Sequence, residues 1–259
     1  MSWFKYSVFS LISIVAVTVS CIVNAEEAPP TGFSIFSVEI KPASQGQFEE
    51  FIVKFKQAAD HIGTVPTWFA SSPGVGQDNT YTFATPFKSF GELAQQQAIL
   101  QEVYDPAEVV RLLGLYQNAV VSTQTYLVHP RPDLSRSAPP REGPAEISLT
   151  LSITVNAGMV PAYEDYVKKL IEATDQTAKD AYWNTYAPGI GAAPRTYGVR
   201  IPQNWVDLDT PNKPFSERLN EAFGERKGAR ILDDGQATIA NIEYAIRRNR
   251  ADLSHMATK

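Results

Sequence analysis

The sequence WFASSPGVG, from Trp68 to Gly76, returns as WNTYAPGIG, from Trp183 to Gly191. The two stretches keep the tryptophan, the proline and both glycines at the same internal spacing, and they lie about 115 residues apart. A duplication of this length makes one repeat a folding unit of its own and favours two modules related by a pseudo-two-fold axis. The signature therefore predicts two related modules within one chain.

The residues around the signature repeat as well. Apolar residues alternate with polar ones before each copy, which predicts a half-buried strand, and a 3-4 spacing then predicts an amphipathic helix. The Pro-Gly-h-Gly segment, where h is Val or Ile, is typical of a turn because proline fixes φ and glycine accepts positive φ. The motif R-x-D-L-S closes each copy, at 131–135 and 250–254. The expected strands are 36–40, 67–69, 80–83 and 119–128, then 151–155, 182–184, 196–199 and 237–246, and the expected helices are 48–59, 106–116, 163–174 and 214–223.

The order of elements in each copy is β-α-β-β-α-β, the ferredoxin-like unit. In this order and in its duplication the chain resembles the dimeric α/β-barrel superfamily, which includes antibiotic-biosynthesis monooxygenases and the NIPSNAP-like and EthD-like groups. The resemblance implies an α+β fold with two tandem ferredoxin-like repeats packed as an intramolecular pseudo-dimeric α/β barrel. No motif in the chain is diagnostic of one member, and a fold alone does not define a reaction.

The expected domain boundaries follow from the repeat and from composition. Pro-rich and charged stretches disfavour both helix and sheet, which predicts a lead-in before the first repeat and a linker between the two. We expect a signal peptide at 1–25, the lead-in at 26–32, the first repeat at 33–128, the linker at 129–145, the second repeat at 146–250 and a tail at 251–259.

The N-terminus predicts export. An apolar core from Val8 to Val23 precedes small residues that fit cleavage after Ala25, so the mature protein is expected in the periplasm or outside the cell. Two alternatives are an uncleaved membrane anchor and a lipoprotein modified at Cys21, although the sequence before Cys21 matches a lipobox poorly. The apolar stretch is shorter than the roughly 20 residues of a spanning helix, so no stable membrane span is expected after cleavage.

Composition excludes several classes of function. Cys21 is the only cysteine of the chain, so a chain cleaved after Ala25 has neither disulfides nor thiolate chemistry. The net charge is −5 before cleavage, and scattered basic residues on an acidic chain argue against nucleic acid as a partner. The remaining length suits two cores of about 105 residues each.

Three residues are weak catalytic candidates: His61, Glu39 and Glu243. His61 stands at the end of the first expected helix, where it would ligate haem or act as a base, but its counterpart in the second copy is Gln176. The alternative is a histidine satisfied by the helix C-terminus. Glu39 and Glu243 alternate with apolar residues on expected strands, so they would be functional if that face is buried and merely solvated if it is open.

Aromatic residues shared by both copies form the expected ligand site: Trp68, Tyr81, Trp183 and Tyr197, with Arg200 as a possible charge partner. They would line a pocket for a small apolar or aromatic ligand. The alternative is that large aromatic side chains simply fill the core. Arg200 has Ala84 as its counterpart and thus breaks the symmetry of the repeat.

The remaining histidines, His129 and His255, fall in the linker and the tail, so no metal site is expected. No cofactor is expected either, with haem left open by the resemblance. The leading hypothesis is an exported binding or structural protein that holds a small apolar or aromatic ligand. The alternatives are a cofactor-free monooxygenase-like or haem-handling enzyme and a protein-protein interaction module, and oligomerisation beyond the internal pseudo-dimer stays open.

Overall fold

The computed structural model describes residues 30–75, 79–93, 99–137, 144–178, 181–210 and 212–257. The expected signal peptide at 1–25, with Cys21 and the cleavage site, lies outside the described residues, as do parts of the expected lead-in and linker. Within the described ranges, no helix combines the length and the apolar character needed to cross a membrane.

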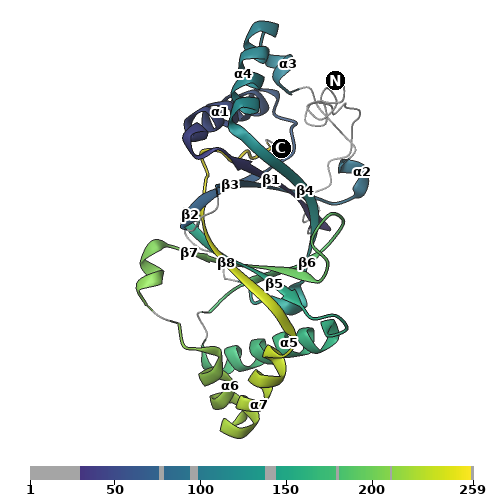
Figure 1. The fold of residues 1–259 in the computed structure, drawn as a ribbon, viewed down its shortest axis with the longest axis vertical. Helices are drawn as coiled ribbons and strands as arrows, with labels where there is room; N and C mark the ends of the chain where they lie inside the picture. Colours follow the sequence, from purple (N-terminus) through teal and green to yellow (C-terminus); the bar gives the residue numbers. More distant parts are fainter. Residues whose placement is uncertain are drawn as a thin grey trace, which may run out of the picture. The chain divides into compact units, whose positions relative to one another are not determined.

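The eight strands found in the described part of the chain form one closed β-barrel in the order β1-β3-β2-β8-β5-β7-β6-β4 (Figure 1). The strand pairs with an assigned register are antiparallel. The strands are β1 (Gly32–Ile40), β2 (Phe69–Val75), β3 (Thr80–Phe87), β4 (Val120–Pro130), β5 (Ile147–Val155), β6 (Asn184–Pro188), β7 (Thr196–Gln203) and β8 (Ile239–Asn249). The α-helices are α1 (Gln45–Ile62), α2 (Phe90–Leu93), α3 (Ile99–Val103), α4 (Pro106–Ala119), α5 (Val160–Thr177), α6 (Phe215–Phe223) and α7 (Glu225–Gln236), with short 3-10 turns η2 (Pro42–Ser44), η3 (Pro132–Leu134) and η4 (Trp205–Asp209).

The predicted fold class, two tandem ferredoxin-like repeats packed as a pseudo-dimeric α/β barrel, is wrong. The strands do not form one sheet for each repeat, because they belong to a single closed antiparallel barrel. The helical content also exceeds two helices for each repeat, since α2, α3 and α4 follow β3, and η4, α6 and α7 follow β7.

The duplicated Pro-Gly segments explain this difference. They were expected to turn the chain, but Pro73 and Gly74 lie inside β2, and Gly189 directly follows β6. A Cβ on Gly74 would stand 2.6 Å from the carbonyl oxygen of Ile246 in β8. Similarly, the Gly189 N–H donates to Leu127 O in β4 at 2.9 Å. The glycines thus allow the close backbone approach through which β2 joins β8 and β6 joins β4.

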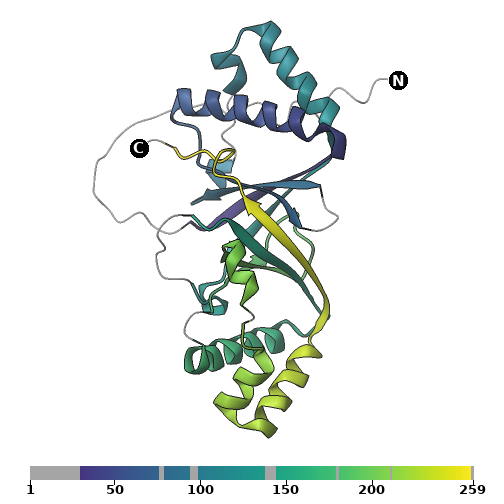
Figure 2. The same cartoon turned by 90° about the vertical axis from the view of Figure 1, so that its left-hand side faces the viewer.

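The chain divides into two compact units. Unit 1 comprises 1–72, 78–125 and 250–259, and unit 2 comprises 73–77 and 126–249. In unit 1, helices α1 and α4 cover one face of the sheet (Figure 2). The α1 side chains Phe48, Phe51 and Ile52 pack with Tyr81 of β3, and the core also includes Leu253 from the end of the chain.

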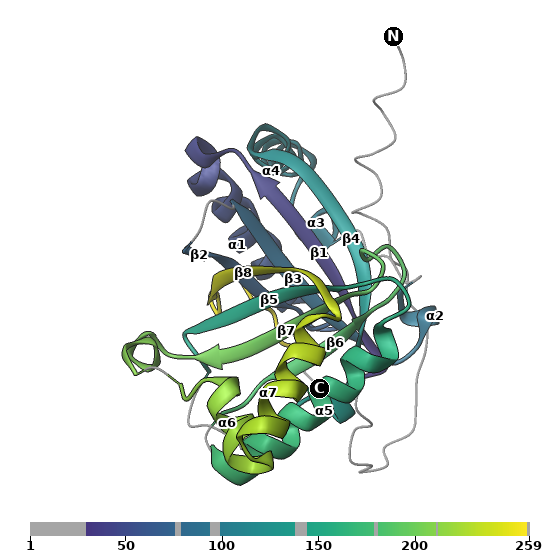
Figure 3. The same ribbon diagram turned by 60° about the horizontal axis from the view of Figure 1, so that its bottom comes forward.

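Unit 2 repeats this plan with different side chains. Strands β5, β7 and β8 run side by side (Figure 3). Val155 of β5 and Tyr197 of β7 pack against Tyr163 and Val167 of α5. Because side chains alternate along a strand, the residues next to Val155 on β5 and next to Tyr197 on β7 face away from α5. Leu134, from the turn η3 after β4, is fully buried in this core.

The buried leucines of the two R-x-D-L-S segments give a first prediction. Leu253 and Leu134 are each 0% exposed, so replacing either with alanine leaves a cavity and should lower the free energy of unfolding by about 2 to 5 kcal/mol. Chemical denaturation measures the change. Val110→Ala on α4, at a side chain that is 70% exposed, is the control and should alter stability little. Equal losses for Leu253→Ala and Val110→Ala would contradict the docked position of the chain end.

Candidate functional site

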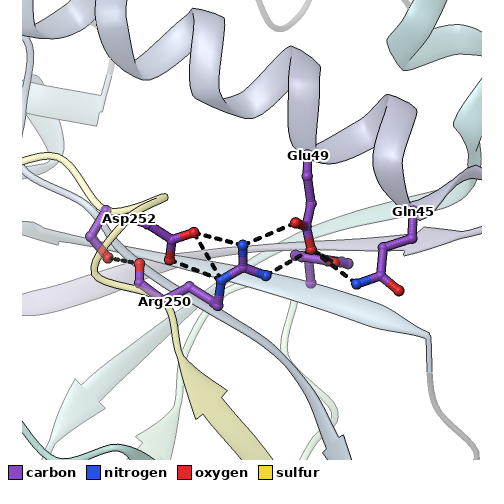
Figure 4. A network of polar contacts seen from close by, with 6 residues as sticks. Gln45, Glu49, Arg250 and Asp252 are labelled. Carbon is purple, nitrogen blue, oxygen red and sulfur yellow. Dashed lines mark hydrogen bonds and ion pairs between the residues drawn. The ribbon is translucent and has the colours of Figure 1, made fainter.

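A charged cluster in unit 1 joins the end of the chain to helix α1 (Figure 4). The Arg250 guanidinium donates to both carboxylate oxygens of Glu49, at 2.7 and 3.0 Å, and also to Asp252 at 2.7 Å. Gln45 donates to Glu49 at 3.0 Å, and the Tyr81 hydroxyl donates to the same carboxylate. The Glu49 carboxylate is thereby bound on every side by donors.

These contacts set the protonation states of the unit 1 cluster. The Arg250 hydrogen bonds are the largest cause of a Glu49 pKa lowered from 4.5 to about 2, and they outweigh burial, which acts in the opposite direction. Burial and the adjacent Glu49 carboxylate raise the pKa of Tyr81. At neutral pH, Glu49 is therefore ionised and Tyr81 protonated, so neither is poised to exchange a proton.

Unit 2 contains the same cluster built from the other copy of the motif. Arg131 donates to Glu164 at 2.9 Å and to Asp133 at 2.7 Å, and the Tyr197 hydroxyl donates to Glu164 at 2.6 Å. The Arg131 hydrogen bonds lower the pKa of Glu164, while burial raises the pKa of Tyr197 to about 12. Both clusters are structural ion pairs of low reactivity.

The duplicated tryptophans hold the same two segments. Trp68 Nε1 donates to Leu253 O at 2.8 Å, and Trp183 Nε1 donates to Leu134 O at 3.0 Å. Trp68 and Trp183 are 8% and 7% exposed. Their indole N–H groups, like the hydroxyls of Tyr81 and Tyr197, are thus committed to contacts within the protein. Ligand binding by these four aromatic residues, expected from the sequence, stays a prediction.

His255 was expected in a C-terminal tail, but its side chain is buried in unit 1. It is 1% exposed and stacks on Trp68 with ring centroids 4.8 Å apart. Its Nδ1 lies 2.6 Å from Asp60 Oδ1, and its Nε2 lies 3.1 Å from the carbonyl oxygen of Val65. Burial raises the pKa of Asp60, but hydrogen bonds from Lys56 and His255 outweigh it and lower the pKa, so Asp60 is a carboxylate. Both partners offer acceptor oxygens, so each ring nitrogen of His255 is engaged within the protein.

Arg136 occupies the matching place in unit 2. It donates to Asp175 at 2.6 Å and lies over the Tyr182 ring at 5.0 Å. A backbone bridge pairs Arg136 with Trp183, as another pairs His255 with Trp68. In each unit, the residue directly after the R-x-D-L-S motif therefore contacts an aspartate near the end of the long helix. In the sequence, the only sign that Arg136 and His255 occupy matching positions was the R-x-D-L-S motif directly before each of them.

The weak catalytic candidates do not come together. His61 lies exposed in the last turn of α1. Glu39 is exposed on β1 and accepts a hydrogen bond from Ser122 at 2.8 Å, and Glu243 is exposed on β8 and accepts one from Asn241 at 3.2 Å. None of the three is in a buried acid-base pair, so their catalytic roles stay predictions.

Arg200 lies in a different environment from the other candidates. It is on β7, two residues from Gly198, and faces away from α5 because its neighbours Tyr197 and Val199 alternate with it. Its Nε donates to Ser148 Oγ at 2.8 Å, and its Nη2 donates to Asn249 Oδ1 at 2.9 Å. Within the described residues, these neutral groups are its hydrogen-bond partners and no carboxylate forms an ion pair with it.

The donor set does not fit a haem ligand. His255 has both ring nitrogens engaged, and His61 is exposed at a helix end. His129 is half-buried on β4, with its Nε2 3.0 Å from the position of a Cβ on Gly189, which leaves little room for a bulky group there. Across the described ranges, no three His, Cys, Asp or Glu side chains gather as a metal site.

Comparison with known proteins gives fold relatives only. No protein-family model matches the chain, and no curated protein matches it by sequence. A provisionally named monooxygenase of Fusobacterium nucleatum superposes with a TM-score of 0.54 at 7% identity, covering 86% of this chain and 94% of its own. A provisionally named monooxygenase of Lactobacillus acidophilus gives 0.51 at 9% identity, covering 88% and 97%. A mutant chlorite dismutase of Candidatus Nitrospira defluvii gives 0.50 at 7% identity, covering 86% and 93%.

These neighbours support part of the resemblance inferred from the sequence. Monooxygenases were among the proteins that it named, and structures given that name share the fold over most of both chains. A fusion of two repeats is not confirmed by them. At identities below 10%, the likeness concerns the fold and assigns no activity.

The Glu49 cluster predicts a specific dependence of stability on pH. Because the Glu49 pKa is lowered from 4.5 to about 2 in the folded state, its ionised form stabilises the fold fully above about pH 4.5. This stabilisation is lost as the pH falls towards 2. Glu49→Gln should therefore lower the unfolding midpoint at pH 7, and the difference from wild type should shrink between pH 4.5 and 2.

Glu50→Gln is the matched control for this experiment. Glu50 is the next residue of α1, and its side chain is 47% exposed in a surface pair with Arg111. An exposed pair of this kind contributes little to stability. A Glu49→Gln defect that persists unchanged at pH 2 would contradict the assigned charge state.

The buried His255 side chain gives a further prediction. His255→Phe keeps an aromatic ring against Trp68 but removes both ring nitrogens and their hydrogen bonds, so it should lower the free energy of unfolding by about 2 to 3 kcal/mol. His255→Arg introduces the residue that unit 2 has at the matching position, Arg136, and should retain more of the stability because it can still donate to Asp60. Thermal unfolding measures both variants. Equal stability of His255→Phe and wild type would show that the ring is not held by its two acceptors.

Proposed function

We propose that this protein is an exported, cofactor-free monooxygenase-like enzyme that acts on a small aromatic substrate. The observation that carries the proposal is the sheet face of unit 2 with Arg200, Gly198 and Tyr186. The fold shared with two provisionally named monooxygenases supports it. Export rests on the N-terminal sequence alone.

The three residues differ chemically from the static clusters on the α5 side. Tyr186 of β6 pairs in register with Gly198 of β7. At Gly198, the only atom within 4.0 Å of an added Cβ, apart from the adjoining chain, is Tyr186 Cβ. An aromatic side chain, a glycine and a cation thus lie on one face of the sheet, which suits an aromatic ligand with a polar group.

The proposed reaction class needs only dioxygen and the substrate. Because the histidines do not form a haem site, the substrate itself supplies the electrons in this proposal. A methylene flanked by aromatic groups reacts with dioxygen so that CH₂ and O₂ become C=O and H₂O, which balances atoms and electrons. The role of the protein is to hold the substrate and stabilise the charge that develops on it.

Oxygen uptake tests the proposal. The purified mature protein should consume oxygen with a tricyclic aromatic ketone that carries such a methylene, and isotopically labelled oxygen should appear in the product carbonyl. Arg200→Gln should reduce the rate by about tenfold or more. Arg230→Gln on α7, at a side chain 84% exposed, is the control. Ligand binding without oxygen uptake would reject the enzyme and favour a binding protein.

Haem titration tests the cofactor-free part separately. Adding haemin to the purified protein should give only the spectrum of free haemin, and His61→Ala should not change the result. The expectation follows from the engaged nitrogens of His255 and the exposed position of His61. A saturable Soret band at one haem per chain would overturn it.

A further inference from the structure

The two halves differ in polar residues on one face of β7. In the first half, the residues at the positions of Gly198 and Arg200 are Thr82 and Ala84. The two residues that hold Arg200 also lack polar counterparts, because Ser148 corresponds to Phe33 and Asn249 to Pro130. The second half alone therefore carries an arginine, the groups that orient it and a glycine beside it.

The Arg200 guanidinium is oriented without being neutralised. Ser148 is 1% exposed, and its hydroxyl accepts from Arg200 Nε and donates to Asn249 Oδ1 at 3.1 Å. Asn249 is itself fixed because its Nδ2 donates to Ala145 O at 2.7 Å. The acceptors are neutral, so the positive charge of Arg200 is uncompensated by an ion pair in the part of the chain that the structure describes.

This arrangement contrasts with that of the arginines in, and directly after, the two R-x-D-L-S segments. Arg250 and Arg131 each bind two carboxylates, and Arg136 binds one. The Arg200 bonds to Ser148 and Asn249 use two of the five N–H donors of a guanidinium, which leaves three for a ligand. A half-buried cation that lacks a counterion attracts an anion more strongly than an exposed cation does, because water screens it less.

The neighbouring aromatic residue shows that the charge acts on this face. Burial raises the pKa of Tyr186, and the positive charge of Arg200 opposes that rise. Both residues share a face with Gly198: Tyr186 is its partner on β6, and Arg200 is two residues further along β7. A flat ring would fit against Tyr186 there while its anionic group meets Arg200.

We propose that the face of β7 formed by Gly198 and Arg200, with Tyr186, is a binding site for an aromatic anion, a carboxylate or an enolate on a planar ring. The inference rests on the proposed function and defines its substrate class. The guanidinium binds the anionic oxygen, Ser148 and Asn249 position the guanidinium, and the absence of a side chain at Gly198 leaves space for the ring.

Isothermal titration calorimetry with benzoate tests the site, with benzamide as the neutral analogue of the same shape. Wild-type protein at low salt should bind one benzoate per chain, and benzamide at least about tenfold more weakly. Arg200→Gln should weaken benzoate binding by at least about tenfold, and Arg230→Gln should leave it unchanged. Equal affinity for the two probes, no saturable benzoate binding, or full affinity in Arg200→Gln would overturn the proposal.

Gly198→Thr gives an independent variant that keeps Arg200 and its partners. It installs the residue found at this position in the first half, so β7 should tolerate it, while its side chain fills the space for the ring. We expect benzoate affinity to fall by at least about tenfold with the unfolding temperature little changed. Unchanged affinity would place the anion elsewhere and contradict the site.

The two proposals fail in different ways. Arg200-dependent benzoate binding without oxygen uptake on any substrate supports the anion site and rejects the enzyme. Oxygen uptake on neutral substrates that is the same in Arg200→Gln and wild type supports the enzyme and rejects the anion site. A purely structural role for Arg200 would lower the unfolding temperature of Arg200→Gln and leave benzoate affinity unchanged in the folded fraction.

Discussion

The bidentate pair between Arg250 and Glu49 is the contact on which unit 1 depends. Both side chains are mostly buried, at 20% and 24% exposed, so their charges are screened less than those of a surface pair. Removing either partner would leave a charge with poor access to water, which is far more costly than losing an exposed pair. The pair holds the segment that also delivers Leu253 to the core and a carbonyl acceptor to Trp68.

The same contact makes the two units unequal. Arg250 is 201 residues from Glu49 along the chain, whereas Arg131 is only 33 residues from Glu164. Contacts between distant residues require the closure of long loops and slow folding. Unit 2 can therefore complete its cluster from neighbouring sequence, while unit 1 must wait for the end of the chain. The R-x-D-L-S motif is the same in both, but only the second copy ties the C-terminus to the fold.

The sequence predicted the elements better than their assembly. Alternation located β1 and β5, and helical spacing located the long helices α1 and α5, because both patterns record which side of an element is buried. The Pro-Gly segments were misinterpreted as turns because local chemistry does not reveal that Gly74 faces the Ile246 carbonyl, a contact between residues far apart in sequence. His255 was missed for a similar reason, since nothing near it in sequence indicates Asp60 or Val65 as its partners.

The duplicated polar residues and the unique ones have opposite physical character. In both clusters each arginine meets carboxylates, and each carboxylate meets several donors, which stabilises one protonation state and one conformation. A group held in this way has few hydrogen-bonding atoms left for a ligand. Arg200 is held equally well by Ser148 and Asn249 but keeps its charge, because the groups that hold it are neutral. Such a cation is costly to maintain in a folded protein unless something binds to it, and the residues that maintain it occur in one half only. Symmetry in this chain thus marks the scaffold, and the departure from symmetry at Gly198 and Arg200 marks the place where a ligand would gain the most.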